Sequence, residues 1–382
     1  MKKFLDCISV VGSTPSRFQG TKKYVSTGAV ATTEIDESEV VEVSYEDRPS
    51  RANLTAEAGD ILFAKMQGTR KTLLLDSETE ENIYSTGFYA VRANPEIITT
   101  ECLYYLVDSE LFLAQKDKNC SGATQKAITN GGLAKIEIRI PPLSEQAVLT
   151  EKLRYLTQLI ADRKKQLELF DEVIKSRFIE MFGEPESNPL HWAMLPLEKC
   201  LTVLGGYAFK SEEFKTSGVP VLRIGNINTG VFTPTNMVYW TEDDSLERYQ
   251  VLPGDLVISL TGTVGKDDYG NVCILGNAYP LYYLNQRNAK LILGESLNKH
   301  YLSELLKFSQ IKKKLTGISR GVRQANISNR DILNLVVPIP PIELQTQFAA
   351  FVEQTDKSKF EIQQSLEKLE ILKKSLMQQY FG

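Results

Sequence analysis

The chain has 382 residues, of which 42% are hydrophobic, so it can bury the cores of two or three domains and is not a disordered segment. Its formal net charge of −4 excludes a uniformly basic nucleic-acid coat but not a local basic surface. Five scattered cysteines, two histidines and no long apolar run exclude a disulfide scaffold, a histidine-rich metal site and a membrane helix.

The first 142 residues predict a globular part of short β-strands, with strand segments within 24–30, 59–70, 71–76 and 87–93. One amphipathic helix is expected near residues 100–115. Cations and amides follow the second segment and recur before residue 130, and these are the residue types that bind phosphates and base edges. The candidate DNA-binding residues of this part are Lys65, Gln67, Arg70, Lys71, Thr124, Gln125 and Lys126. Residues 34–60 are strongly acidic and are expected to face away from a duplex or toward another protein.

Residues 143–183 predict one long helix. Pro141 and Pro142 block the helix upstream, while Gly183 and Pro185 end it. At 1.5 Å per residue, its 38 or so residues would span about 57 Å. Apolar residues recur at alternating spacings of four and three, which is typical of a coiled-coil seam. The expected seam is Leu149, Leu153, Leu156, Ile160, Leu167, Phe170 and Ile174.

Residues 184–341 predict a second globular part, with strand segments within 218–227, 254–265 and 271–276 and a helix near 297–314. Residues 302–331 carry seven cations and two anions. Residues 261–266 resemble a phosphate loop, but Leu260 and Asp267 stand where that motif needs Gly and Ser or Thr. The candidate DNA-binding residues here are Arg223, Asn226, Thr263, Lys266, Lys312, Lys313, Arg320, Arg323 and Gln324.

Residues 342–382 predict a second long helix and reveal an internal repeat. Residues 122–183 align with 321–382 at a constant offset of 199 without a gap, so that Gln125 matches Gln324 and Gln146 matches Gln345. The second seam is expected at Phe348, Val352, Ile362, Leu366, Leu369 and Leu376. Two such helices would bury their apolar stripes best against each other in an antiparallel pair. Independent helices, each docked on its own globular part, are the alternative.

Several stretches carry a family likeness. Residues 205–232 (GGYAFKSEEFKTSGVPVLRIGNINTGVF), 253–265 (PGDLVISLTGTVG) and 338–345 (PIPPIELQ) resemble the specificity (S) subunit of type I restriction-modification systems. The junction at residues 181–192 (MFGEPESNPLHW) is similar to the linker of that family. In the first part, residues 24–35 replace the usual arginine-containing strand.

This resemblance implies an α+β protein with two α/β target-recognition domains separated by a pair of long antiparallel coiled-coil helices, with pseudo-two-fold internal repetition. The implied boundaries are 1–142 and 184–341 for the recognition domains and 143–183 and 342–382 for the helical regions. Each domain would read one half of a bipartite sequence in double-stranded DNA, and the helices would set the spacing between the halves.

The resemblance also implies a cytoplasmic, non-catalytic chain without a metal or cofactor of its own. The helices would dock two modification (methyltransferase) subunits, which bring S-adenosylmethionine, and restriction (motor and nuclease) subunits would bring ATP and Mg²⁺. The absence of nucleotide, cofactor and catalytic motifs fits this division of labour. The rival interpretations are a non-DNA scaffold with two globular heads on a coiled coil, and a methyltransferase or nuclease that acts alone.

Overall fold

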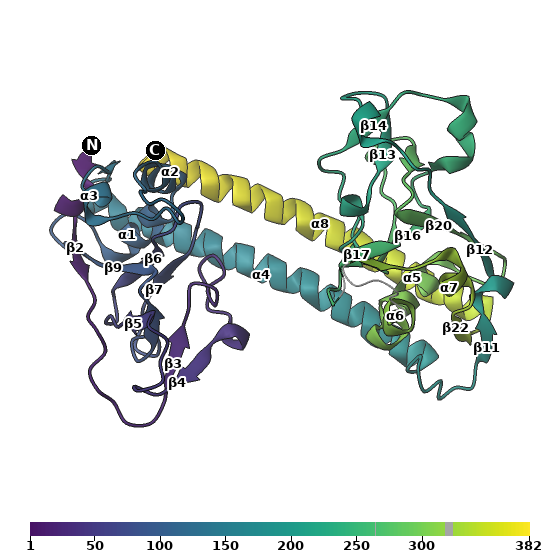
Figure 1. Ribbon diagram of the computed structural model, residues 1–382, viewed down its shortest axis with the longest axis horizontal. Helices are drawn as coiled ribbons and strands as arrows, with labels where there is room; N and C mark the ends of the chain where they lie inside the picture. The colour runs from purple at the N-terminus through teal and green to yellow at the C-terminus, as the bar shows by residue number, and fades with distance from the viewer. Residues whose placement is uncertain (264, 318–323) are drawn as a thin grey trace. The chain divides into compact units, whose positions relative to one another are not determined.

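The computed structural model describes residues 1–263, 265–317 and 324–382. The chain forms two compact units, each made of a globular part and portions of both long helices (Figure 1). Unit 1 consists of residues 1–165 and 363–382, and unit 2 consists of residues 166–362. The contacts therefore divide the chain through the middle of each long helix, whereas the sequence suggested four consecutive segments.

Unit 1 contains two four-stranded sheets. The first is antiparallel throughout and has the order β2 (Ile8–Val11), β9 (Phe88–Ala93), β6 (Ile61–Ala64) and β7 (Thr72–Leu74). The second has the order β4 (Val41–Val43), β3 (Lys22–Val25), β8 (Ile83–Ser85) and β5 (Ala52–Leu54), with one parallel pair, β3–β8. A short ladder joins β1 (Lys2–Lys3) to β10 (Glu137–Ile138). The helices are α1 (Thr100–Val107), α2 (Glu110–Lys118) and α3 (Asn130–Leu133), with short 3₁₀ turns at Phe4–Asp6 and Glu37–Glu39.

Unit 2 repeats the order and direction of the strands in both four-stranded sheets. Its antiparallel sheet has the order β12 (Leu201–Gly205), β20 (Asn288–Leu293), β16 (Leu256–Ser259) and β18 (Val272–Ile274). Its mixed sheet has the order β14 (Val238–Trp240), β13 (Val219–Leu222), β19 (Tyr282–Leu284) and β15 (Gln250–Val251), again with one parallel pair, β13–β19. Two ladders complete it, β11 (Ala193–Pro196) with β22 (Val336–Ile339) and β17 (Thr261–Thr263) with β21 (Gln324–Asn326). The helices are α5 (Lys299–Lys307), α6 (Ser309–Thr316) and α7 (Asn329–Leu333), with 3₁₀ turns at Leu197–Lys199, Ser211–Glu213, Ile224–Asn226 and Asp244–Tyr249. The internal repeat predicted from the sequence is thus confirmed.

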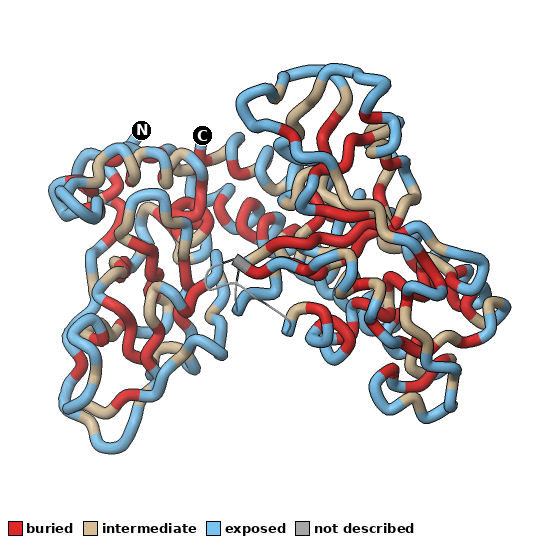
Figure 2. The backbone as a smooth tube through the Cα atoms, turned by 45° about the vertical axis from the view of Figure 1, so that its right-hand side comes forward, coloured by how far each residue is buried: buried red, intermediate tan, exposed pale blue. Residues whose placement is uncertain are grey.

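The central strands β6 and β16 are buried on both faces (Figure 2). Along β6, Ile61 and Phe63 join the core that packs on the helices, while Leu62 and Ala64 join a second core under the mixed sheet. Side chains alternate between the two faces of a strand, so a strand between two cores is apolar throughout. This explains why β6 (ILFA) is hydrophobic throughout and why β16 (LVIS) is hydrophobic up to Ser259, which is also buried.

The single amphipathic helix predicted in each globular part is wrong, because each is two helices. Ser109 is extended (φ −72°, ψ 148°) and its side chain accepts a hydrogen bond from the Phe112 amide, so a new helix begins there. In unit 2, Phe308 is extended in the same way (φ −62°, ψ 127°). The apolar periodicity continued through both breaks and concealed them.

The two long helices are α4 (Leu143–Phe182) and α8 (Ile342–Phe381). Within unit 1, Leu149 and Leu153 of α4 share a core with Met377 and Phe381 of α8.

Within unit 2, the Lys359 ammonium lies 2.6 Å from the Asp171 carboxylate, and Ile174 shares a core with Phe348 and Val352. In each unit the early residues of one helix meet the late residues of the other, so the pairing is antiparallel. Of the predicted seam residues, Leu149, Leu153, Leu156, Ile174, Phe348, Val352 and Leu366 are buried, whereas Ile160, Leu167, Phe170, Ile362, Leu369 and Leu376 are half-buried.

Candidate nucleic-acid interface

In unit 1, the structure brings together two loops that are far apart in the sequence. The loop after β6 pairs with the segment before α3 through a bridge between Met66 and Ala127. The Gln67 amide donates to the Lys126 carbonyl (2.9 Å), and the Ile128 amide donates to the Lys65 carbonyl (2.9 Å). A hollow of about 400 Å³ opens between the loops, lined by Met66, Gln67, Gly68, Ala123, Thr124, Gln125 and Lys126. Four predicted DNA-binding residues therefore meet on one exposed surface, namely Gln67, Thr124, Gln125 and Lys126.

Unit 2 pairs the equivalent segments. The ladder β17–β21 aligns Thr263 with Gln324, and the Ile327 amide donates to the Leu260 carbonyl (2.8 Å). Leu260 and Ile327 correspond in the repeat to Lys65 and Ile128, so the two units close their loops with the same hydrogen bond. Arg320 and Arg323 lie outside the described residues, and only the backbone of Gln324 is described. We call each pair of joined segments a paired loop: residues 64–71 with 119–128 in unit 1, and residues 259–271 with 324–327 in unit 2.

Asp268 shapes the tip of the unit 2 paired loop. Its carboxylate accepts hydrogen bonds from the backbone amide (2.8 Å) and hydroxyl (2.9 Å) of Thr263, and these bonds lower the pKa of Asp268. Lys266 lies in the same turn, is exposed and donates its backbone amide to the Thr263 carbonyl (3.0 Å). Thr263 thus offers no free hydroxyl proton, while the Lys266 ammonium remains available to a phosphate.

Two predicted residues of unit 2 hold a neighbouring loop. Asn226 is 3% exposed; its carbonyl oxygen accepts the Arg223 amide (2.9 Å), and its amide group donates to the carbonyls of Thr233 and Thr235 (3.1 Å each). The Arg223 guanidinium donates to the Asn236 carbonyl (2.6 Å). Asn226 therefore uses its hydrogen-bonding groups inside the protein, which conflicts with a base contact by this residue.

Lys312 and Lys313 are neighbours on α6 but point in different directions. Lys313 is exposed. Lys312 is 8% exposed; its ammonium donates to the Asn271 side-chain oxygen (2.5 Å) and forms an ion pair with Asp267. The predicted phosphate contact therefore fits Lys313, whereas Lys312 supports the loop from inside because its buried charge needs these partners.

Lys65, Arg70 and Lys71 are also engaged within unit 1. The Lys65 ammonium donates to the Thr86 carbonyl (2.9 Å) and lies 4.5 Å from the centre of the Tyr89 ring, and burial lowers the pKa of Lys65. The Lys71 ammonium donates to the Thr27 carbonyl (2.5 Å). These contacts turn the two lysines toward the protein, although each ammonium uses only one of its three donors in the bonds described.

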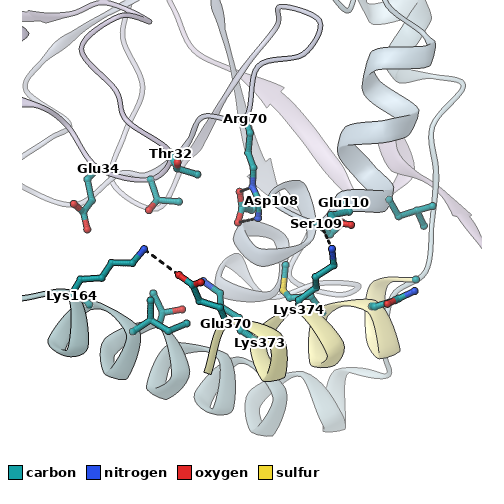
Figure 3. Close-up of a pocket in the computed structure, with 18 residues that line it drawn as sticks. Thr32, Glu34, Arg70, Asp108, Ser109, Glu110, Lys164, Glu370, Lys373 and Lys374 are labelled. Carbon is teal, nitrogen blue, oxygen red and sulfur yellow. Dashed lines mark hydrogen bonds and ion pairs between the residues drawn. The ribbon is translucent and has the colours of Figure 1, made fainter. Parts of the chain in front are cut away.

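Arg70 lies in the wall of a different cavity, of about 640 Å³ (Figure 3). Its guanidinium makes two hydrogen bonds to Asp108 (2.9 and 2.8 Å), a carboxylate whose side chain is only 6% exposed. Two further ion pairs line the same cavity, Lys164–Glu370 (3.4 Å) and Lys374–Glu110 (3.0 Å). Arg70 is therefore held by a nearly buried anion and is poorly placed to leave it for a base.

Lys116, a buried lysine of α2 that contacts the unit 1 paired loop, is not among the DNA-binding residues predicted from the sequence. Its side chain, on α2, is 1% exposed and its ammonium donates to the carbonyls of Ala64 (3.4 Å), Met66 (3.0 Å) and Thr69 (2.8 Å). It also lies 3.3 Å from the Asp117 carboxylate. No local pattern distinguishes this lysine from the exposed Lys118 two residues later.

The repeated glutamines fasten each long helix to its globular part. Gln146 is fully buried; its amide group donates to the carbonyls of Ile97 and Pro141 (3.0 Å each), and its oxygen accepts the Thr99 amide (2.8 Å). Gln345 makes the same three bonds in unit 2, to the Ser296 and Pro340 carbonyls and from the Asn298 amide. Each glutamine thereby ties the start of a long helix to the N-cap residue of an earlier helix, Thr99 of α1 in unit 1 and Asn298 of α5 in unit 2.

In the described part of the chain, no group of three or more His, Cys, Asp or Glu side chains could hold a metal ion. Nor does any helix of that part combine the length and apolar character that crossing a bilayer demands.

The duplicated architecture matches a known family. Residues 12–169 and 189–373 fit the sequence profile described as the type I restriction modification DNA specificity domain. This chain belongs to that family. The resemblance noted from the sequence is thereby confirmed, as is its prediction of two recognition domains.

Individual relatives of the chain are named as specificity subunits of type I restriction enzymes. The chain is 28% identical over 261 residues to the type I restriction enzyme MjaVIII specificity subunit of Methanocaldococcus jannaschii, covering 63% of this chain and 60% of that relative. It is 25% identical over 319 residues to the EcoKI specificity subunit of Escherichia coli K12, covering 77% and 67%. The solved S subunit of a type I restriction-modification system from M. genitalium has a similar fold, with a TM-score of 0.58 and 14% identity over 100% of this chain and 95% of that one.

Proposed function

We propose that this chain is the DNA-reading subunit of a type I restriction-modification complex, in which each unit reads one half of a bipartite target. The observation that carries the proposal is the duplicated paired loop, because the same two segments meet in both units and present exposed amides and cations. In unit 1 these are Gln67, Thr124, Gln125 and Lys126. In unit 2 the described one is Lys266, and Lys313 adds an exposed cation on α6, whose neighbour Lys312 contacts the loop. Two copies of one surface on one chain suit two half-sites on one duplex.

Among these exposed residues, the residue types suggest a division of roles. The amides of Gln67 and Gln125 can present a donor and an acceptor side by side to an adenine edge. The ammonium groups of Lys126, Lys266 and Lys313 can neutralise phosphates and fix the register without reading sequence. Arg320, Arg323 and Gln324 remain proposed base-reading residues of unit 2 on the strength of their sequence position alone.

The antiparallel helices would hold the two half-sites apart and dock the modification subunits. In this arrangement the chain carries no catalytic group and no cofactor. The modification subunits would supply S-adenosylmethionine, and restriction subunits would supply ATP with Mg²⁺. We place the complex in the cytoplasm, with access to both the DNA and these cofactors.

Mapping methylated adenines in host DNA with and without this gene tests the proposal. We expect a two-part motif with a fixed spacer that disappears on deletion and returns on complementation. Methylomes that do not differ, in a strain shown to express the modification subunits, would contradict a role in target reading.

A second experiment separates DNA reading from a scaffold role. Binding of the reconstituted complex to random duplex should weaken steeply as salt rises, because counterions released from phosphates drive it. Binding that does not respond to salt, or no binding by a complex that assembles fully, would favour a scaffold with two globular heads.

A further inference from the structure

Lys116 lies beneath the unit 1 paired loop, on the side away from solvent. Three of the loop's carbonyls, those of Ala64, Met66 and Thr69, converge on one ammonium group that is almost completely buried. A lysine ammonium has three donors and no acceptor, so three carbonyls satisfy it fully. A buried charge is tolerated only with such partners, and here the three carbonyls and the Asp117 carboxylate (3.3 Å) supply them, so the ammonium ties the path of the loop to α2.

The loop held in this way is the one that carries the exposed candidate Gln67. Gln67 lies in the sequence between Met66 and Thr69, whose carbonyls accept from Lys116. Its own side-chain amide donates to the backbone carbonyl of Asp117 (3.3 Å), which lies on α2 beside Lys116. The thiol of Cys120, just beyond α2, adds a weak contact to the Lys65 carbonyl (3.8 Å). The end of α2 is thus a platform on which the path of residues 64–69 is built.

In unit 2 a buried lysine also supports the paired loop, but through different contacts. Lys312 of α6 is buried below the unit 2 paired loop and contacts the side chains of Asn271 and Asp267 instead of carbonyls. Asn271 in turn donates to the Asn228 carbonyl (2.5 Å), which connects the paired loop to the loop held by Asn226. In the repeat, Lys312 corresponds to Leu113 and not to Lys116, so each unit has placed a buried lysine on a different turn of its second helix.

We propose that Lys116 is a positioning residue that fixes the target preference of unit 1 by setting the path of residues 64–69, without touching DNA itself. This inference rests on the proposed function and deepens it, because it names a buried group on which base reading depends. A side chain can discriminate a base edge only when its backbone is held in place to well within a hydrogen-bond length. Removal of the ammonium should therefore relax one half-site and leave the other unchanged.

The test uses the full chain assembled with its modification subunits, acting on a plasmid library in which both half-sites are randomised. Methylation is read by sequencing, which gives the discrimination against each single mismatch in each half. In the wild-type complex a mismatch should cost roughly 5- to 150-fold. K116M is close to lysine in length but has no donor, and we expect its discrimination in one half to fall to about threefold or less, with the other half within twofold of wild type.

K118M is the matched control. It also replaces a lysine by methionine, two residues after Lys116, but the Lys118 side chain is exposed. It should leave the mismatch pattern of both halves within twofold of wild type. G68A perturbs the same loop without touching the buried lysine. Gly68 has φ +71° and open space where a Cβ would lie, so an alanine there strains only the backbone. G68A should relax the same half-site as K116M, and it decides the question if K116M does not fold.

Unchanged discrimination in both K116M and G68A would overturn the inference, as would an equal loss in both half-sites. If the wild-type complex reads no bipartite target at all, the proposed function fails and this inference falls with it. If the wild-type complex reads a bipartite target and both variants keep its mismatch discrimination, the inference fails but the proposed function stands.

Discussion

The buried glutamine at the start of α4 offers the sharpest test of how the helices are attached. Replacement of Gln146 by alanine would leave three buried backbone groups unpaired, the carbonyls of Ile97 and Pro141 and the amide of Thr99. An unsatisfied buried polar group costs about 1–3 kcal/mol, and some water would enter the space. We therefore expect a local loss of about 2–4 kcal/mol in unit 1.

The assay is amide hydrogen exchange on the native chain, because two units need not unfold together and a single global free energy is then poorly defined. If local opening controls exchange, amides in α1 (Thr100–Val107) should exchange roughly 30- to 700-fold faster in Q146A, since each 1.4 kcal/mol is a factor of ten. The matched variant Q345A should produce the same effect in α5 and leave α1 unaltered.

The control is Q158A, which removes an exposed glutamine from the same helix together with one hydrogen bond to Asp162 (2.9 Å). It should change exchange in α1 by less than about threefold, because an exposed pair of this kind contributes only about 0.2–0.5 kcal/mol. Equal effects of Q146A and Q158A, or no effect of Q146A, would refute the view that the buried amide fastens the helix.

Three further outcomes are expected. R70A should destabilise unit 1 by about 1–2 kcal/mol in denaturant unfolding, because the nearly buried Asp108 loses both hydrogen bonds. R70K should recover only part of this, and full recovery would contradict the importance of the two-pronged contact. Burial lowers the pKa of His300, and this effect outweighs the neighbouring carboxylates of Glu353 and Asp356, which raise it. The unfolded chain therefore binds the proton more readily than the folded chain, and the free energy of unfolding should fall as the pH drops below about 6.5. H300Q should lessen that dependence, and an unchanged slope would exclude His300 as its source. Finally, a thiol reagent at pH 8 should label Cys120 well before the other four cysteines, because those four are buried. Burial also raises the pKa of Cys102 and Cys273 to about 12, so their thiols stay protonated at this pH. Mass mapping of the first labelled peptide checks this.

The sequence alone predicted the features that depend on neighbouring residues or on the internal repeat. The 199-residue offset predicted two similar units, and the proline pairs and Gly183 predicted where the long helices begin and end. The strand segments were found because their residues are apolar and β-branched, although strands such as β2 and β8 were missed and the strand order was not predicted. Order depends on contacts between segments that are distant in the chain, which a single sequence does not record.

Only the tertiary structure decided which cations face solvent. Lys312 and Lys313 are adjacent and chemically identical, yet one ion-pairs with Asp267 and the other is exposed. Lys116 and Lys118 differ in the same way, and Arg70 is committed to Asp108, a residue 38 positions away. A charged side chain turns inward when the fold supplies buried partners for it, and those partners come from other elements. Composition therefore located the basic segments, while three-dimensional packing determined which of their charges remain free to meet a phosphate.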